Sequence, residues 1–139
     1  MPVGDLAGPG GTLPEVGTAG HHLAGMGVHQ YESEVEGTKL WYQVVSLDGQ
    51  VLVWVSSDAP TFANLSLAIN LRDDKAGPAV SHVLGPETAG PGEALARKLC
   101  RRLGQAVFCS WNVNTADPLV VAHAERTIAD KLRDLKIMR

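Results

Sequence analysis

Residues 51–55, with the sequence VLVWV, place five apolar side chains in a row. Because successive residues of a strand point to opposite faces of a sheet, a strand with this sequence is apolar on both faces. Asp48 and Gly49 come just before it and tolerate the positive φ angles of a type I′ turn, so the sequence predicts a hairpin of residues 39–47 and 50–57. The fold must therefore cover both sides of this hairpin.

A two-residue turn fixes the register of the hairpin and separates its faces. It pairs Leu47 with Gln50, Val45 with Leu52, Gln43 with Trp54 and Trp41 with Ser56. One face then carries mainly β-branched residues that pack well under helices, namely Leu40, Tyr42, Val44, Val51, Val53 and Val55. The other face mixes large apolar groups with amides, namely Trp41, Gln43, Val45, Leu47, Gln50, Leu52 and Trp54. This mixture is typical of the core of a protein interface.

The remaining chain predicts four more strands and two helices. The strands are residues 28–35 at an edge, 64–70 with a helix left open as the alternative, 79–85, and 105–113 in the centre of the sheet. The helices are residues 93–103, ending before Gly104, and 118–135, beginning after Asp117. The prediction is an α+β fold, a mostly antiparallel sheet of about six strands.

Two helices suffice for one face of such a sheet, because each covers about 10 Å and strands repeat every ~4.8 Å. The opposite face, which carries Trp41, Leu52 and Trp54, would be an association hazard on a monomer. We therefore expect this face to be available for dimerisation, with Trp41, Gln43, Val45, Leu52 and Trp54 as interface residues. The alternatives are that the sheet curls on itself or that the N-terminal segment folds over it.

Composition indicates one domain and excludes several classes of partner. The chain has 139 residues, a formal net charge of -3 and a pI near 5.9, so we expect neither nucleic acid nor membrane as a partner. Residues 1–27 are rich in Gly and Pro and are predicted to be a flexible tail, followed by a domain of residues 28–139. Cys100 and Cys109 are expected to be reduced thiols. A secretory or mitochondrial targeting signal requires basic residues, and no Lys or Arg precedes Lys39. We expect a cytoplasmic, or also nuclear, location.

No motif indicates catalysis, a cofactor or a metal. The five histidines lack the spacing of a metal site, and the glycine-rich segment 8–12 lacks the lysine of a phosphate-binding loop. A small hydrolase using Ser110, Cys109 or His82 is the enzyme alternative, but the glycines that flank a hydrolase serine are missing. We therefore expect that the protein is not an enzyme and binds no cofactor or metal.

Four basic residues fall within two turns of the first predicted helix, away from its apolar stripe: Arg97, Lys98, Arg101 and Arg102. Such a face is usually solvated. In a net acidic protein it is also a candidate contact for an acidic partner surface.

The order and spacing of several segments resemble the proteasome assembly chaperone family, most closely its chaperone 4 members. These segments are VLVWVSSDAP, ANLSLAI, HVLG, the LARKL helix, QAVFCSWNV and the closing VVAHAERTIADKL helix. The likeness runs from Tyr31 to Leu135, and chaperone 3 is the alternative within the same system. None of these segments is a catalytic signature.

The resemblance implies a non-enzymatic subunit that pairs with proteasome assembly chaperone 3 through facing sheets. It also implies that the pair holds alpha subunits during assembly of the 20S proteasome alpha ring and leaves before maturation. A non-catalytic adaptor of another pathway is the stronger rival, because an apolar sheet face and a basic helix suit many partners.

Overall fold

The expected hairpin lies in the middle of the sheet. The computed structural model describes residues 20–23, 26–71, 77–86 and 90–138. Strands β3 (Thr38–Leu47) and β4 (Gln50–Ser57) are joined at Asp48 and Gly49, and Gly49 has a φ of 79°. The predicted register is confirmed at all four pairs, from Leu47 and Gln50 to Trp41 and Ser56.

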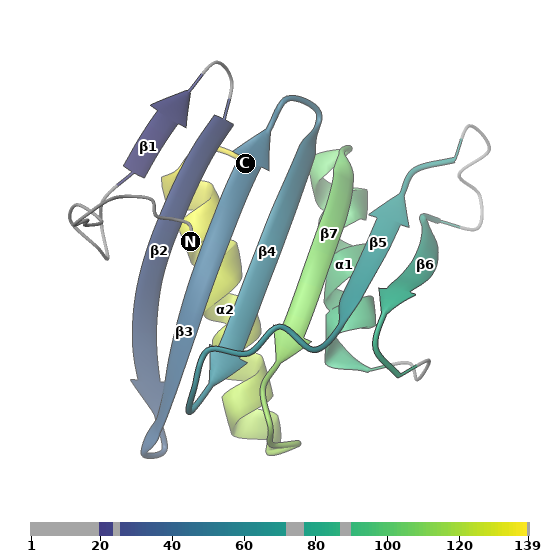
Figure 1. The fold of residues 1–139 in the computed structure, drawn as a ribbon. Helices are drawn as coiled ribbons and strands as arrows, with labels where there is room; N and C mark the ends of the chain where they lie inside the picture. The colour runs from purple at the N-terminus through teal and green to yellow at the C-terminus, as the bar shows by residue number, and fades with distance from the viewer. Residues whose placement is uncertain (1–19, 24–25, 72–76, 87–89, 139) are drawn as a thin grey trace.

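Seven strands form one sheet within the described residues, in the order β1-β2-β3-β4-β7-β5-β6 (Figure 1). The other strands are β1 (Gly20–Leu23), β2 (Met26–Val35), β5 (Leu65–Ile69), β6 (Ala79–Leu84) and β7 (Ala106–Asn112). Among the strand pairs formed here, β4 and β7 run parallel and the others antiparallel. The α+β class, the mostly antiparallel sheet, the six expected strands and the central position of β7 are confirmed.

The N-terminal side of the sheet differs from the expectation. Strand β1 and the first residues of β2 lie inside the range 1–27 that was predicted to be a tail, while residues 1–19 and 24–25 lie outside the described residues. The prediction that residues 28–35 form an edge strand is wrong at its start, because β1 pairs with β2 along Met26–His29. The short β1 has no alternation strong enough to be found from sequence.

Both helices lie on the same side of the sheet (Figure 1). Helix α1 (Pro91–Leu103) contacts β5, β6 and β7, and α2 (Pro118–Asp134) contacts β3. The Asp117 side chain accepts a hydrogen bond from the Leu119 amide at 3.0 Å and so caps α2, while Gly104 ends α1 with a φ of 70°. Gly92 lets α1 approach the sheet, because a Cβ there would lie 2.7 Å from the Cβ of Trp111.

The core lies between the helices and the sheet. All six β3 and β4 residues predicted to face the helices are at most 2% exposed. They pack with buried residues of both helices and β7, including Leu95, Leu99, Val107, Ile128 and Leu132. Neither helix of the described part is both long and apolar enough to cross a membrane.

The structure predicts that Ile128 is a major contributor to stability. Ile128 is fully buried on α2, so Ile128→Ala should lower the free energy of unfolding by about 2–5 kcal/mol through lost burial and a residual cavity. Leu119→Ala is the matched control on the same helix, because Leu119 is 61% exposed, and should change stability by less than about 0.5 kcal/mol. Urea denaturation measures both; equal effects would contradict the placement of the core.

Candidate protein interface

The five predicted interface residues lie together on the side of the sheet away from the helices, which we call the open face. Trp41, Gln43 and Val45 come from β3, and Leu52 and Trp54 from β4. The register places Val45 beside Leu52 and Gln43 beside Trp54. All five are intermediate in burial, whereas the β3 and β4 residues that face the helices are buried, namely Leu40, Tyr42, Val44, Val51, Val53 and Val55.

Pairing across the sheet extends this set into an apolar row. The row joins Val28 of β2, Val45, Leu52, Phe108 of β7 and Leu67 of β5. The sequence did not single out Val28, Phe108 or Leu67 as interface residues. The alternation within each strand predicts which of its residues share a face. It does not predict that β7 and β5 lie beside β4, because that order depends on contacts between residues distant in sequence.

The segment between β4 and β5, residues 58–64, crosses the end of the open face in front of β4 and β7 (Figure 1). Trp54 Nε1 donates a hydrogen bond to the Thr61 carbonyl at 2.8 Å. Ser56 Oγ donates to the Ala59 carbonyl at 2.7 Å and accepts from the Thr61 amide at 3.1 Å. These bonds fix both the crossing segment and the position of the Trp54 indole.

Asn64 anchors the other end of this segment to β7. Its Oδ1 accepts from the Trp111 amide at 2.9 Å, and its Nδ2 donates to the Trp111 carbonyl. The side-chain amide thus occupies the place of a neighbouring strand. Asn112 Oδ1 accepts from the Ala63 amide at 2.7 Å and holds the segment next to it.

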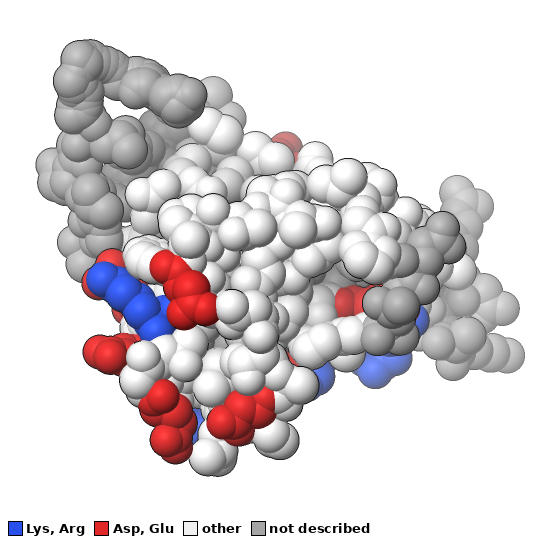
Figure 2. Space-filling model, turned by 60° about the horizontal axis from the view of Figure 1, so that its bottom comes forward, with Lys and Arg blue, Asp and Glu red and all other residues white. Residues whose placement is uncertain are grey.

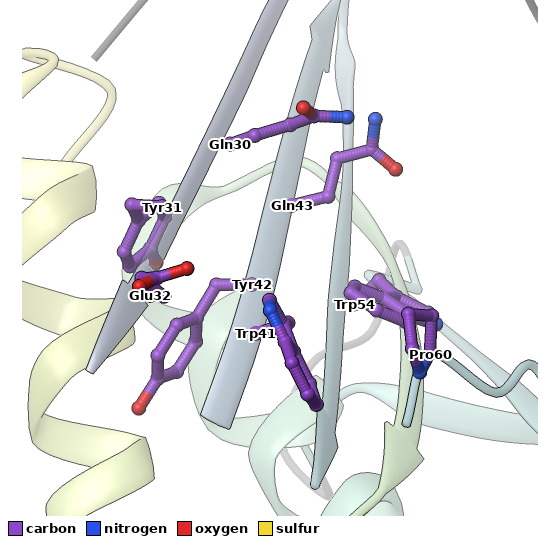
Figure 3. A pocket seen from close by; sticks show the side chains of 8 residues that line it. All are labelled: Gln30, Tyr31, Glu32, Trp41, Tyr42, Gln43, Trp54 and Pro60. Carbon is purple, nitrogen blue, oxygen red and sulfur yellow. The ribbon is translucent and has the colours of Figure 1, made fainter. Parts of the chain in front are cut away.

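A pocket of about 630 Å³ lies on the open face between the two tryptophans (Figure 3). Its lining includes Gln30, Glu32, Trp41, Gln43, Trp54 and Pro60. Tyr31 and Tyr42 also border it, but their rings belong to the helix-covered side, where they stack at a centroid distance of 4.6 Å. The pocket therefore combines two indoles and a proline with two amides and one carboxylate.

Charged side chains gather at one end of this surface. Figure 2 shows a broad uncharged area, with a group of acidic and basic side chains at its left and lower left and others along its lower edge. Lys39 Nζ lies 3.3 Å from Glu32 Oε1 and 5.5 Å from the centroid of the Trp41 ring. Glu34 pairs with Lys39 across the strands and is exposed. The rim of the pocket is therefore polar and net acidic.

The predicted basic face is exposed on α1, on the opposite side of the molecule. Arg97, Arg101 and Arg102 are exposed, as is Lys98. Lys98 Nζ, however, lies 3.2 Å from Glu125 Oε1 of α2, so one of the four positive charges is paired within the chain. The three arginines carry most of the positive charge of this face.

Sequence comparison decides the family. The model of the family named proteasome assembly chaperone 4 matches residues 39–113, which is more than half of the chain. The chain belongs to this family.

A solved structure agrees with this family at the level of the fold. It is titled "Crystal Structure of a Novel Chaperone Complex for Yeast 20S Proteasome Assembly" and matches with a TM-score of 0.53 and 14% sequence identity. The match covers 78% of this chain and 94% of the yeast chain. A comparison with curated protein sequences gave no significant match. Membership in the chaperone 4 family makes this a non-catalytic proteasome assembly chaperone.

The residues considered for a hydrolase do not form a catalytic group in this chaperone. Ser110 and Cys109 are adjacent in β7 and point to opposite faces. Cys109 pairs with Ser66, and Ser66 pairs with His82, so the cysteine and histidine are two strand spacings, about 10 Å, apart. His82 Nε2 instead lies 2.7 Å from the Gly85 carbonyl.

The thiols are also unsuited to nucleophilic chemistry. Burial, together with a smaller effect of the Glu125 charge, raises the pKa of Cys109 to about 12. Burial also raises the pKa of Cys100, and both cysteines are free. Among the described residues no group of three or more His, Cys, Asp or Glu side chains is placed to bind a metal.

Thiol labelling should follow from this burial. The thiolate is the reactive form, and a raised pKa keeps Cys109 protonated well above pH 8.5, so iodoacetamide should label it negligibly in the folded protein from pH 7 to 9. Both thiols should react in 6 M guanidinium chloride, which serves as the control. Mass spectrometry counts the labels; rapid native labelling of Cys109 that rises through pH 8 would contradict the assigned environment.

Proposed function

We propose that the chain pairs with proteasome assembly chaperone 3 through its open face and assists assembly of the 20S proteasome alpha ring. It then leaves before the particle matures. The observation that carries the proposal is the pair of half-buried tryptophans, Trp41 and Trp54, on a sheet face that the described helices leave uncovered. Membership in the chaperone 4 family supplies the biological context.

A second sheet is the partner surface that best fits the shape and chemistry of the open face. The apolar row from Val28 to Leu67 crosses five strands, so its cover must be broad as well as apolar. Two sheets packed face to face bury such rows between them at a separation of about 10 Å. Aromatic side chains at the centre of an interface commonly carry a large share of its binding free energy, which gives Trp41 and Trp54 the leading role.

A separate surface is needed for the alpha subunit, because the open face is occupied in the pair. We assign this contact to Arg97, Arg101 and Arg102 of α1, with Lys98 contributing less because Glu125 already pairs with it. Exposed charge pairs contribute little each, about 1 kcal/mol or less, and mainly raise the association rate. Such a contact suits a chaperone that must leave its substrate.

Trp54→Glu should abolish pairing with chaperone 3. It places a charge in the open-face pocket, and we expect the dissociation constant to rise at least about 30-fold. Leu119→Glu is the control, because it puts the same charge on an exposed apolar residue of the helix layer. Size-exclusion chromatography with light scattering measures the pair, and circular dichroism checks folding. A normal pair formed by folded Trp54→Glu protein would refute the interface assignment.

Reversing the charge of Arg97 and Arg101 together to Glu should weaken capture of alpha subunits without affecting the chaperone pair. We expect a loss of several-fold that is larger at low salt, because the contact is electrostatic. The matched control reverses Arg126 and Arg133 of α2, which are also exposed. Affinity purification of the tagged pair reports both steps; precursor alpha subunits recovered equally with both variants would remove α1 from the contact.

The same purification separates the chaperone from an adaptor of another pathway. The proposed function requires precursor proteasome subunits without the mature particle. Recovery of an unrelated complex, with no proteasome subunits, would favour the adaptor.

A further inference from the structure

The open-face pocket has a chemistry that differs from the apolar row beside it. Two neighbouring rows of side chains form it, namely Gln30, Gln43 and Trp54 in the first and Glu32 and Trp41 in the second. Pro60 of the crossing segment closes one side next to Trp54 (Figure 3). An apolar surface would be enough to pack a second sheet, so the amides and the carboxylate point to a more specific occupant.

The two glutamines have unused hydrogen-bonding capacity. Within the described part of the chain, neither the Gln30 nor the Gln43 side chain forms a hydrogen bond with another residue. A covering sheet that supplied apolar groups alone would leave both amides buried without partners, which is unfavourable.

Glu32 adds a negative charge to the same space. Its carboxylate pairs with Lys39 at 3.3 Å, and the Lys39 ammonium lies near the Trp41 ring, which shows that this indole already accepts a cation. Glu34 lies opposite Lys39 across the strands but forms no ion pair with it, so the rim carries two carboxylates and one ammonium group that is already paired with Glu32. The remaining charge deficit calls for a cation from the partner.

We infer that the pocket receives an arginine side chain from the partner sheet, an inference that depends on the proposed pairing through the open face. Its stem lies against Trp54 and Pro60, and its guanidinium lies over the indole surface and donates to Glu32 and to the amide oxygens of Gln30 and Gln43. A guanidinium has five donors in a planar fork and stacks on aromatic rings, which an apolar side chain or an ammonium cannot combine. The pocket thus sets the register of the two sheets.

A leucine replacement distinguishes the two kinds of occupant by the sign of its effect. If the occupant is an arginine of the partner, Gln43→Leu removes the amide oxygen to which its guanidinium donates, so the dissociation constant for chaperone 3 should rise about 5- to 10-fold. An apolar occupant would instead bind more tightly, because a buried amide without a partner has been removed. Isothermal titration calorimetry with purified chaperone 3 measures the change.

Charge neutralisation provides the matched pair of variants. Glu32→Gln should raise the dissociation constant at least about 10-fold and reduce its dependence on salt. Glu34→Gln, on the same strand and face but outside the pocket lining, should change it less than about 3-fold. Chaperone 3 arginines are then replaced one at a time by Met. When the arginine that enters the pocket is missing, Glu32→Gln should no longer change the dissociation constant appreciably, which is the non-additivity expected of two residues in direct contact.

The outcomes separate this inference from the proposed function. Normal or tighter binding by both Gln43→Leu and Glu32→Gln, with Trp54→Glu still disruptive, would overturn the arginine pocket and leave the pairing intact. Absence of wild-type binding to chaperone 3 would overturn both. Three results together would establish the pocket: both pocket variants lose affinity, Glu34→Gln binds with nearly unchanged affinity, and Glu32→Gln is coupled to one partner arginine.

Discussion

The structure depends on strands that are apolar on both faces. Strands β4 and β7 lie side by side in the middle of the sheet, and each sends large apolar groups in both directions. On one side Val51, Val53 and Val55 are fully buried, because α1 and α2 pack over that layer. On the other side the described residues supply one crossing segment, which covers the end of the face. We propose that the remaining apolar surface, including Trp54 and Phe108, is covered by association with a partner.

The sequence predicted this arrangement wherever the signal was local. The Asp48-Gly49 turn fixed the hairpin register, and the helix stripes together with Asp117 and Gly104 fixed both helices closely. Two of the missed features are nonlocal. The parallel pairing of β4 with β7 and the path of the β4–β5 segment depend on contacts between distant residues, for which no short pattern exists. The pairing of β1 with β2 is local, but the four residues of β1 show no alternation from which a strand could be predicted.

The same distinction explains the candidate site. Trp41, Gln43, Val45, Leu52 and Trp54 follow from one hairpin, so alternation alone placed them on one face. The pocket also needs Gln30 and Glu32 from β2 and Pro60 from the crossing segment, and their approach to the tryptophans follows from the folded sheet. Likewise, the four basic residues of α1 were visible in sequence, but the pairing of Lys98 with Glu125 requires the two helices to be placed side by side.

An assembly chaperone has to combine lasting pairing with its partner and reversible binding of its substrate, and the two layers of this fold offer surfaces of those two kinds. Desolvated apolar area gives binding that salt hardly affects, whereas exposed arginines on a helix give contacts that form quickly and break readily. The sheet face suits the lasting pairing that we propose, and the α1 face suits the reversible one. Because the layers lie on opposite sides of the core, the proposed capture and release of a subunit on α1 would leave the proposed sheet pairing undisturbed.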